Sequence, residues 1–446
     1  MCDTLLAQPD STWHGITLFG KNSDRQRNEA QIVERVPGRL HAKDALLQCT
    51  YLAIPQVRRT YAAFLCRPFW MWGAEMGVNE CGVAIGNEAL HARTPGPQEK
   101  SLLGMDLVRL GLERAGTAAE AVEVITTLLQ AHGQGGNCGH LTPYFYNNGF
   151  MIADAAHAFV LETIGKEWLV EEVRGVRAIS NRYSIHRPDR QSDGLKSQVC
   201  DAGWSDADQP DYAEALTNPE REPIGNAGAR LASSSALLSA AKGRLQTEDL
   251  MRILRDHGSG GEHRTEWSNS CAVTRTLCMH AGAEDRPGQT VGSMVCELHG
   301  PRQLHWVTAT AATCTSIFKP LLPDVPVPAH GSAVSGRFDP ATLWWRHEKL
   351  HRGAVLRGLA GFIRDIGAER DALELQFRVR MNAVIDGGNA ADRARAVEQC
   401  WQEAMQLEEA WSAQFHSPAA TIASTPYELH WREMSRLAAM DDLGSP

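Results

Sequence analysis

Several features are missing from this sequence, and each absence excludes a class of protein. No stretch approaches the roughly 18 to 20 consecutive apolar residues that span a bilayer, and the mean hydropathy is −0.30, so we expect no membrane association. No run of lysines or arginines could follow a phosphate backbone, and 44 basic against 53 acidic residues give a net charge of −9. Nucleic acid is therefore not an expected partner.

The N-terminus and the cysteines also lack familiar signatures. The first residues carry neither a basic segment nor a long apolar segment, which predicts no secretory signal and a cytoplasmic protein. The eleven cysteines are odd in number, and no two of them form a C-x-x-C pair. We therefore expect reduced thiols that mostly fill the core, rather than a disulfide framework.

What is present is the composition of a globular protein. The 446 residues are 43% hydrophobic and 22% charged. At about 150 residues per domain, this length suits roughly three domains or one large domain with an extension. The Pro-rich stretch 320–328 precedes helical patterns at 339–383 and 389–415. We predict one domain over 1–319, then a linker and helical extension over 320–446.

Runs of strand patterns alternate with runs of helical patterns. Short apolar runs flank the turn-rich segment 8–11, which predicts a hairpin beginning at the second residue. An amphipathic helix pair is predicted between 103 and 129, with Thr117 and Glu120 in capping-box spacing. Further strands are predicted at 150–153, 158–162, 167–173, 176–180, 294–298 and 304–309, with helices near 230–241 and 247–257. This order favours an α+β fold, and the polar segment 188–227 is predicted to be a surface insertion.

Three weaker motifs point in other directions. Gly15 to Lys21 resembles a phosphate loop, but Asn22 replaces the required Ser or Thr and strand formers fill the loop, so we reject it. His257 and His263 could form a metal pair, but no third ligand follows at a recognised spacing. The aromatic run ending at Trp72 either lines a substrate pocket or packs in the core.

The sharper signal is Cys2. Removal of an initiator methionine is permitted before a small residue, and it would leave a cysteine with both a thiol and a free α-amine. An α-amine titrates near 7.7 to 8.0 and can act as the general base for its own thiol. One residue then supplies nucleophile and base. The predicted second strand ends in Gly20 to Arg25, which would return Asp24 to the start of the chain to orient the amine.

Several segments together resemble the secernins and the related bacterial N-terminal-nucleophile dipeptidases. The matching segments are Cys2 to Leu5, Phe19 to Arg25, Trp72 to Gly77, Gly82 to Glu88, Gly135 to Cys138, Ile179 to Asn181, Cys278 to His280 and Gly292 to Val295. Trp344-Trp345 and Leu350 to Arg352 extend the likeness into the helical region. The resemblance implies a four-layer αββα N-terminal-nucleophile hydrolase fold with a helical C-terminal extension.

The resemblance also implies roles for particular residues. In the broader group that includes choloylglycine hydrolases and penicillin V acylases, a basic residue and an aspartate follow the second strand, matching Lys21 and Asp24. Asn87 matches the position whose backbone N–H serves the oxyanion, and Asn181 matches a side-chain donor. Arg275 is a candidate for the arginine that the acylases carry later in the chain. The substrate-binding candidates are therefore Lys21 and Arg275 from the resemblance, and Trp72 from the aromatic run.

The implied chemistry is hydrolysis of an amide bond through an acyl-enzyme on Cys2. No cofactor or metal is required. The expected partner is a small-molecule or dipeptide substrate, and homo-oligomerisation stays open. Two alternatives remain: an acylase that acts on non-peptide acyl amides, and a secernin-like regulatory or binding protein with little hydrolase activity.

Overall fold

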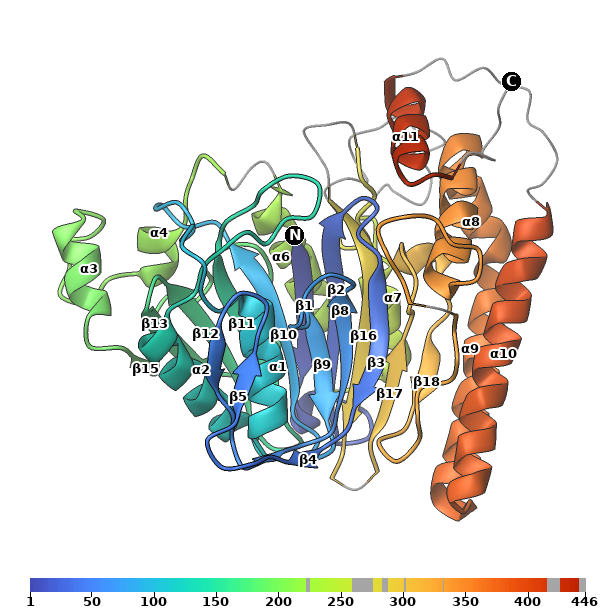
Figure 1. The fold of residues 1–446 in the computed structure, drawn as a ribbon, viewed down its shortest axis with the longest axis horizontal. Helices are drawn as coiled ribbons and strands as arrows, with labels where there is room; N and C mark the ends of the chain where they lie inside the picture. The colour runs from blue at the N-terminus through green and yellow to red at the C-terminus, as the bar shows by residue number, and fades with distance from the viewer. Residues whose placement is uncertain are drawn as a thin grey trace.

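Two antiparallel sheets form the centre of the fold in the computed structural model, which describes residues 1–221, 225–258, 276–282, 288–300, 302–331, 333–414 and 426–440 (Figure 1). The six-stranded sheet has the order β14 (Val176–Ile179), β1 (Cys2–Ala7), β2 (Thr17–Gln26), β16 (Gly288–Leu298), β17 (Leu304–Val307), β18 (Lys319–Leu321). The eight-stranded sheet has the order β15 (Arg190–Gln191), β13 (Glu167–Glu172), β12 (Ala158–Ile164), β11 (Asn147–Ala153), β10 (Ala84–Leu90), β9 (Met76–Asn79), β8 (Ala63–Pro68), β3 (Gln31–Val36). Short strand pairs, β4 (Arg39–Leu40) with β7 (Arg59–Thr60) and β5 (Leu46–Gln48) with β6 (Ala53–Pro55), lie outside these sheets.

Helices cover the outer faces of both sheets. Helices α1 (Gly104–Arg114) and α2 (Ala118–His132) share a hydrophobic cluster with the eight-stranded sheet. Helices α6 (Ala227–Ala240) and α7 (Thr247–Leu254) contact β1, β2, β14 and β16 on the other side. The predicted α+β fold with four αββα layers is thus confirmed. As predicted, Thr117 caps α2, since its side chain accepts the Glu120 N–H.

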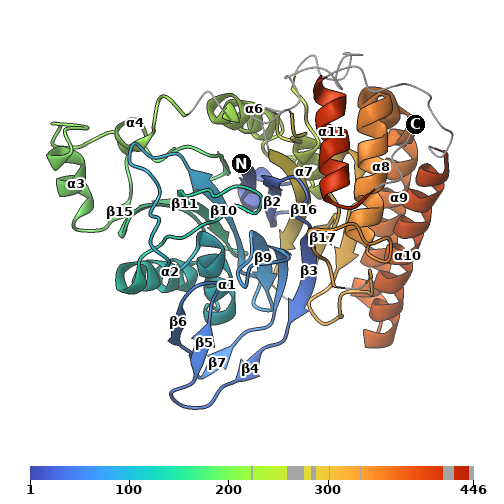
Figure 2. The same ribbon diagram turned by 45° about the horizontal axis from the view of Figure 1, so that its top comes forward.

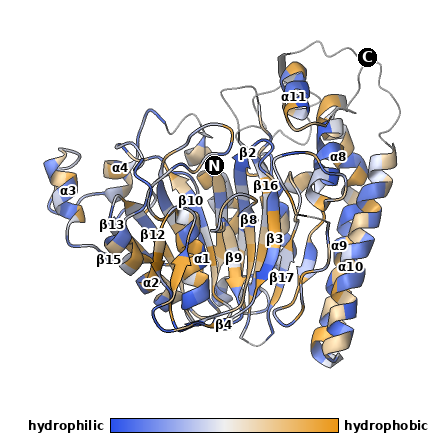
Figure 3. Cartoon of the chain, in the orientation of Figure 1, coloured by the Kyte–Doolittle hydropathy of each residue, from blue (hydrophilic) through white to orange (hydrophobic). Residues whose placement is uncertain are grey.

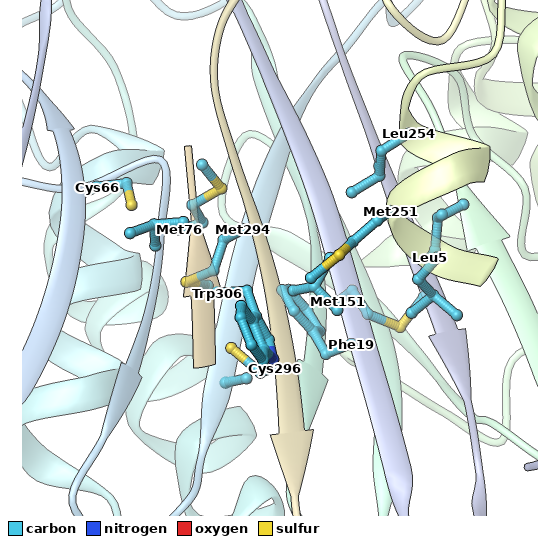
Figure 4. Packing of buried hydrophobic residues seen from close by; sticks show 14 of the residues in the cluster. Leu5, Phe19, Cys66, Met76, Met151, Met251, Leu254, Met294, Cys296 and Trp306 are labelled. Carbon is cyan, nitrogen blue, oxygen red and sulfur yellow. The ribbon is translucent and has the colours of Figure 1, made fainter. Parts of the chain in front are cut away.

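The β1–β2 hairpin sends alternate side chains to opposite faces of the six-stranded sheet. Gly20 leaves room for Leu250 of α7, and Figure 4 shows Met251 and Leu254 extending from this helix toward the strands. Lys21 and Phe19 instead point at β10, where Gly86 leaves the space that they occupy. Cys2 pairs with Ser23 and, by the same alternation, shares the Lys21 face between the sheets.

The C-terminal helices pack against the six-stranded sheet. They are α8 (Leu343–Arg357), α9 (Leu359–Gly387), α10 (Ala390–Gln414) and α11 (Pro426–Leu437). The prediction of one helix over 339–383 is wrong, because Gly358 has a φ of +118° and separates α8 from α9. Hydrophilic and hydrophobic residues alternate along α9 and α10 (Figure 3), and Phe377 and Trp401 join the core cluster that contains Trp306 of β17.

Two further predictions concern segment boundaries and the membrane. The segment predicted as a surface insertion carries two short helices, α3 (Leu195–Asp201) and α4 (Tyr212–Leu216). Strand β18 crosses the predicted boundary between 319 and 320. In the part of the chain that the structure describes, no helix has both the length and the apolar character needed to cross a bilayer.

Candidate active site

Cys2 is the first residue of β1 and opens onto a cavity of about 200 Å³. The N-terminus lies near the ends of β2 and β10, between the two sheets (Figure 2). The cavity is lined by Met1, Cys2, Asp24, Arg25, Gln26, Glu75, Asn87, Ala89, His91, Cys138, Gly139, Thr142, Tyr144, Tyr146, Arg221, Gly225 and Gly288. Of the residues predicted from the sequence, it brings together Cys2, Asp24 and Asn87, and Asn181 lies directly behind Cys2.

The main-chain nitrogen of Cys2 is held by a side chain. It donates a hydrogen bond to Asn181 Oδ1 at 2.8 Å, and the terminal nitrogen of Met1 donates to the Asp24 carbonyl at 2.9 Å. The Met1 side chain occupies the space beside Gly225 and Gly288. Removal of Met1 would therefore convert an already positioned nitrogen into an α-amine and would open space next to it.

The Cys2 thiol lies among polar groups but is buried. Its Sγ is 3.6 Å from Glu75 Oε2 and accepts the Asp24 N–H at 3.4 Å. Burial, together with the charges of Glu75 and Asp24, raises the pKa of the Cys2 thiol to about 11, although Lys21 acts in the opposite direction. The thiol is thus protonated near neutral pH while Met1 is attached, and it needs a base to become a nucleophile.

Asp24 stands at the end of the hairpin with one carboxylate oxygen held. Thr290 of β16 donates to its Oδ1 at 2.6 Å, while Oδ2 has no hydrogen-bond partner among the described residues. Burial and the charge of Asp3 raise the pKa of Asp24 to about 7, against the lowering effects of the terminal amine and Arg230. Its charge therefore changes close to neutral pH.

Arg230 of α6 is a site residue that the sequence did not reveal. Its guanidinium donates to Asn181 Oδ1 at 2.7 Å, to the Cys2 carbonyl at 3.1 Å, and to the Asp3 carboxylate. No local motif marks this arginine, which begins the helix predicted at 230–241. The arginine proposed from the sequence, Arg275, lies outside the described residues.

We expect the substitution Arg230→Met to lower the free energy of unfolding by about 3 to 5 kcal/mol, because it leaves the fully buried Asp3 carboxylate without its ion-pair partner. Urea unfolding of the purified variant measures this. The double variant Asp3→Asn/Arg230→Met serves as the control and should recover part of the loss, since it buries no unpaired charge. Equal stability of single and double variants would contradict this account.

Glu75 is a second site residue that received no role from the sequence. It precedes β9 within Trp72 to Gly77, one of the segments that carry the resemblance, so a signal was present. Its Oε2 faces the Cys2 thiol and accepts from Ser23, while its Oε1 lies 3.2 Å from Arg25. A carboxylate 3.6 Å from a thiol can accept its proton, and a carboxylate at a cavity can hold a cationic group.

Asn87 and Lys21, to which the resemblance assigns roles, are both held by contacts within the protein. The Asn87 backbone N–H donates to the Glu75 carbonyl at 3.1 Å, so the donor assigned to an oxyanion is already engaged. Lys21 is fully buried and donates to the Asn87 carbonyl at 2.7 Å and to Glu88 at 3.0 Å. It does not line the cavity, and its charge is paired with Glu88.

Trp72 lies away from the cavity. Its ring packs under the Arg109 guanidinium, 4.2 Å from the ring centroid, and it contacts the cluster between the eight-stranded sheet and α1. The aromatic lining comes instead from Tyr144 and Tyr146, whose ring centroids are 5.1 Å apart. Of the two interpretations of the aromatic run, lining a pocket or packing in the core, the structure favours core packing for Trp72.

No family model matches the chain. Solved structures with a similar fold include a mutant of the conjugated bile acid hydrolase from Clostridium perfringens (TM-score 0.43, 13% identity, 72% of this chain and 92% of that chain) and penicillin V acylase from Agrobacterium tumefaciens (0.42, 12%, 72% and 86%). A third is the Caenorhabditis elegans ortholog of N-acylethanolamine-hydrolyzing acid amidase (0.33, 11%, 66% and 92%).

Proposed function

We propose that this chain, once Met1 is removed, is an N-terminal-nucleophile hydrolase that cleaves amide bonds of small substrates through an acyl-enzyme on Cys2. The observation that carries the proposal is the placement of one residue's nitrogen and thiol at a cavity, each with its own partners. The nitrogen faces Asn181 Oδ1, and the thiol faces Glu75 and the Asp24 N–H. A cysteine at position 2 that had no catalytic role would need neither of these arrangements.

The proposed reaction begins with proton transfer from the thiol to the neutral α-amine. The thiolate attacks the substrate carbonyl, and the resulting ammonium gives its proton to the leaving nitrogen as the C–N bond breaks. Water then attacks the thioester and gives a proton to the amine. The ammonium returns this proton to the sulfur as the C–S bond breaks, which releases the acid and regenerates the thiol and the neutral amine. Asn181 and Asp24 hold the amine at its position through these steps.

Asn181 is also the remaining candidate for an oxyanion donor. Its Nδ2 carries two N–H groups, one of which donates to the Ala89 carbonyl at 2.9 Å. Arg230 fixes the orientation of this amide, because it donates to Oδ1 and so leaves the NH₂ group to face Ala89. The second N–H is the one proposed to stabilise the negative charge that develops on the substrate oxygen.

We expect Asn181→Ala to lower kcat on the order of 10²-fold to 10³-fold, which corresponds to about 2.7 to 4 kcal/mol. Asn87→Ala should cost less, since the Asn87 backbone N–H already binds the Glu75 carbonyl and so supplies no donor to the oxyanion. The matched control is Asn79→Ala, which removes a buried asparagine that binds the Leu112 and Ala115 carbonyls away from the cavity. It should lower stability without lowering kcat. Wild-type kcat in Asn181→Ala would show that Asn181 is only structural.

The pH dependence of hydrolysis tests the role of Asp24. If both the α-amine and the Asp24 carboxyl must be deprotonated, log(kcat/KM) should fall with a slope approaching two below about pH 7, because the pKa of Asp24 is raised to about 7. In Asp24→Asn the slope should approach one, and the maximum value of kcat/KM should be lower than in the wild-type protein. A slope of one in the wild-type protein would mean that ionised Asp24 is not required.

Dipeptides are the proposed substrate class, in keeping with the resemblance to N-terminal-nucleophile dipeptidases. The cavity is small, and Glu75 and Arg221 bring opposite charges to its lining, which suits a short zwitterionic substrate. Tyr144 and Tyr146 favour the second candidate, an apolar acyl amide.

A substrate panel on the mature protein tests the proposal. Intact mass first establishes that Met1 is absent, and thiol labelling then compares Cys2 with the other ten cysteines. Dipeptides and acyl amides are assayed in parallel, with mass detection of an acyl group on Cys2. Turnover with a Cys2 adduct supports the hydrolase. A mature chain that turns over no amide and forms no adduct supports the secernin-like binding protein instead.

A further inference from the structure

Four side chains of the kinds that bind metal ions lie close together at a second place, outside the cavity beside Cys2. His257 follows α7, Cys278 and His280 lie in the segment 276–282, and Cys314 lies in the short helix η3 (Thr313–Thr315). One ligand atom from each lies within 4.8 Å of all the others. Cys278, His280 and Cys314 are almost completely buried. None of the four lines the catalytic cavity.

The three distances from His280 Nε2 to the other ligand atoms are close to those around a tetrahedral ion. The two Nε2 atoms of His257 and His280 are 3.2 Å apart, and His280 Nε2 is 3.8 Å from Cys278 Sγ and 3.4 Å from Cys314 Sγ. Zinc bonds of about 2.0 to 2.1 Å to nitrogen and 2.3 Å to sulfur imply about 3.3 Å between two nitrogens and about 3.6 Å between nitrogen and sulfur at tetrahedral angles.

Hydrogen bonding alone accounts poorly for this arrangement. His280 Nε2 has three potential ligand atoms within 3.8 Å, yet a ring nitrogen carries at most one proton or one lone pair. Two thiols and two imidazoles that converge on one buried point are the donor set that zinc prefers.

We propose that His257, Cys278, His280 and Cys314 bind one Zn²⁺ ion in a tetrahedral Cys₂His₂ site. Binding deprotonates the two thiols, so two protons pass to solvent, and both imidazoles bind in their neutral form. The four ligands fill the coordination sphere and leave no open position, as is typical of a structural rather than a catalytic zinc.

A second layer of side chains orients one of the ligands. His280 Nδ1 lies 3.1 Å from Nε2 of His351 on α8, and Nδ1 of His351 lies 3.3 Å from Glu348 Oε2. Glu348 in turn accepts from Arg352 at 2.9 Å. Such a chain from a metal-bound histidine to a carboxylate fixes the ring that binds the metal. The site would thereby join α7, η3 and α8.

The same segment reaches the catalytic site through Thr290. The Met279 N–H, between the two ligands Cys278 and His280, donates to Thr290 Oγ1 at 2.9 Å, and Thr290 N–H donates to the Met279 carbonyl at 2.9 Å. The Thr290 hydroxyl donates in turn to Asp24. Met279, Thr290 and Asp24 thus link the proposed zinc site to the Cys2 thiol. The bound ion would hold Asp24 in position through this chain of hydrogen bonds.

Metal analysis of the purified full-length chain tests the site. We expect about one zinc per chain after exhaustive dialysis, and X-ray absorption at the zinc edge should show two sulfurs at about 2.3 Å and two nitrogens at about 2.0 to 2.1 Å. Replacement by Co²⁺ should give thiolate-to-cobalt charge-transfer absorption and tetrahedral ligand-field bands. These measurements need no variant, so they stand even where a ligand substitution prevents folding.

The variant Cys278→Ser/Cys314→Ser should bind zinc at least about tenfold more weakly than the wild-type chain. The matched control, Cys66→Ser/Cys296→Ser, removes two buried thiols from the main core and should keep a full equivalent. Three results would overturn the proposal: no bound zinc with no cobalt spectrum, a disulfide between Cys278 and Cys314 by mass, or zinc retained in the ligand variant. All of these readouts are independent of hydrolase activity, so failure of the proposed function would leave them interpretable.

Discussion

Replacing Cys2 with alanine is expected to lower kcat by on the order of 10⁴-fold or more while leaving the fold intact. The substitution removes the sulfur proposed to form the acyl-enzyme, yet it keeps the backbone nitrogen that binds Asn181 and the strand pairing with Ser23. Steady-state kinetics, with circular dichroism to compare the folds, measure both effects. Cys2→Ser should keep a trace of activity, because serine preserves the position but is a weaker nucleophile.

A second thiol in the same cavity provides the control for this prediction. Cys138 is buried, lines the cavity, and makes a weak hydrogen bond to the Gly136 carbonyl at 3.6 Å. Burial raises the pKa of Cys138 to about 12, so it is no competitor as a nucleophile near neutral pH. Cys138→Ala should therefore keep most of the activity. If it lost as much as Cys2→Ala, the nucleophile would have to be reassigned.

Retention of Met1 should abolish turnover as completely as loss of the thiol. With Met1 attached, the Cys2 nitrogen is an amide that cannot accept a proton, and burial keeps the pKa of the thiol near 11. Inserting a lysine between Met1 and Cys2 blocks removal of the methionine, since processing requires a small second residue. Intact mass verifies that the extension is present, and the assay should then detect no hydrolysis.

A cleavable leader that ends directly before Cys2 supplies the matched control. Before cleavage the chain should be inactive, and cleavage in the test tube should restore activity by exposing the α-amine without any change in the rest of the sequence. Undiminished activity in the chain with the lysine insertion would contradict the mechanism, because no α-amine would then be available at Cys2.

The sequence alone determined the features that depend on local patterns. Short apolar runs on either side of a turn at 8–11 specify the hairpin that begins at Cys2, and Thr117 with Glu120 specifies the start of α2. The potential of Cys2 as nucleophile and base follows from its position and its chemistry. Such features depend only on contacts between residues that are close in sequence. They can therefore be predicted before the fold is known.

The tertiary structure decided which distant residues meet these groups. Arg230 lies 228 residues from Cys2 in sequence and Asn181 lies 179 residues away, and only the placement of α6 and the end of β14 beside β1 brings them together. The same holds for His257, Cys278, His280 and Cys314, which share no recognised metal-ligand spacing. Sheet and helix packing, rather than sequence separation, sets these distances, because residues far apart along the chain become neighbours only when the layers bury their common core.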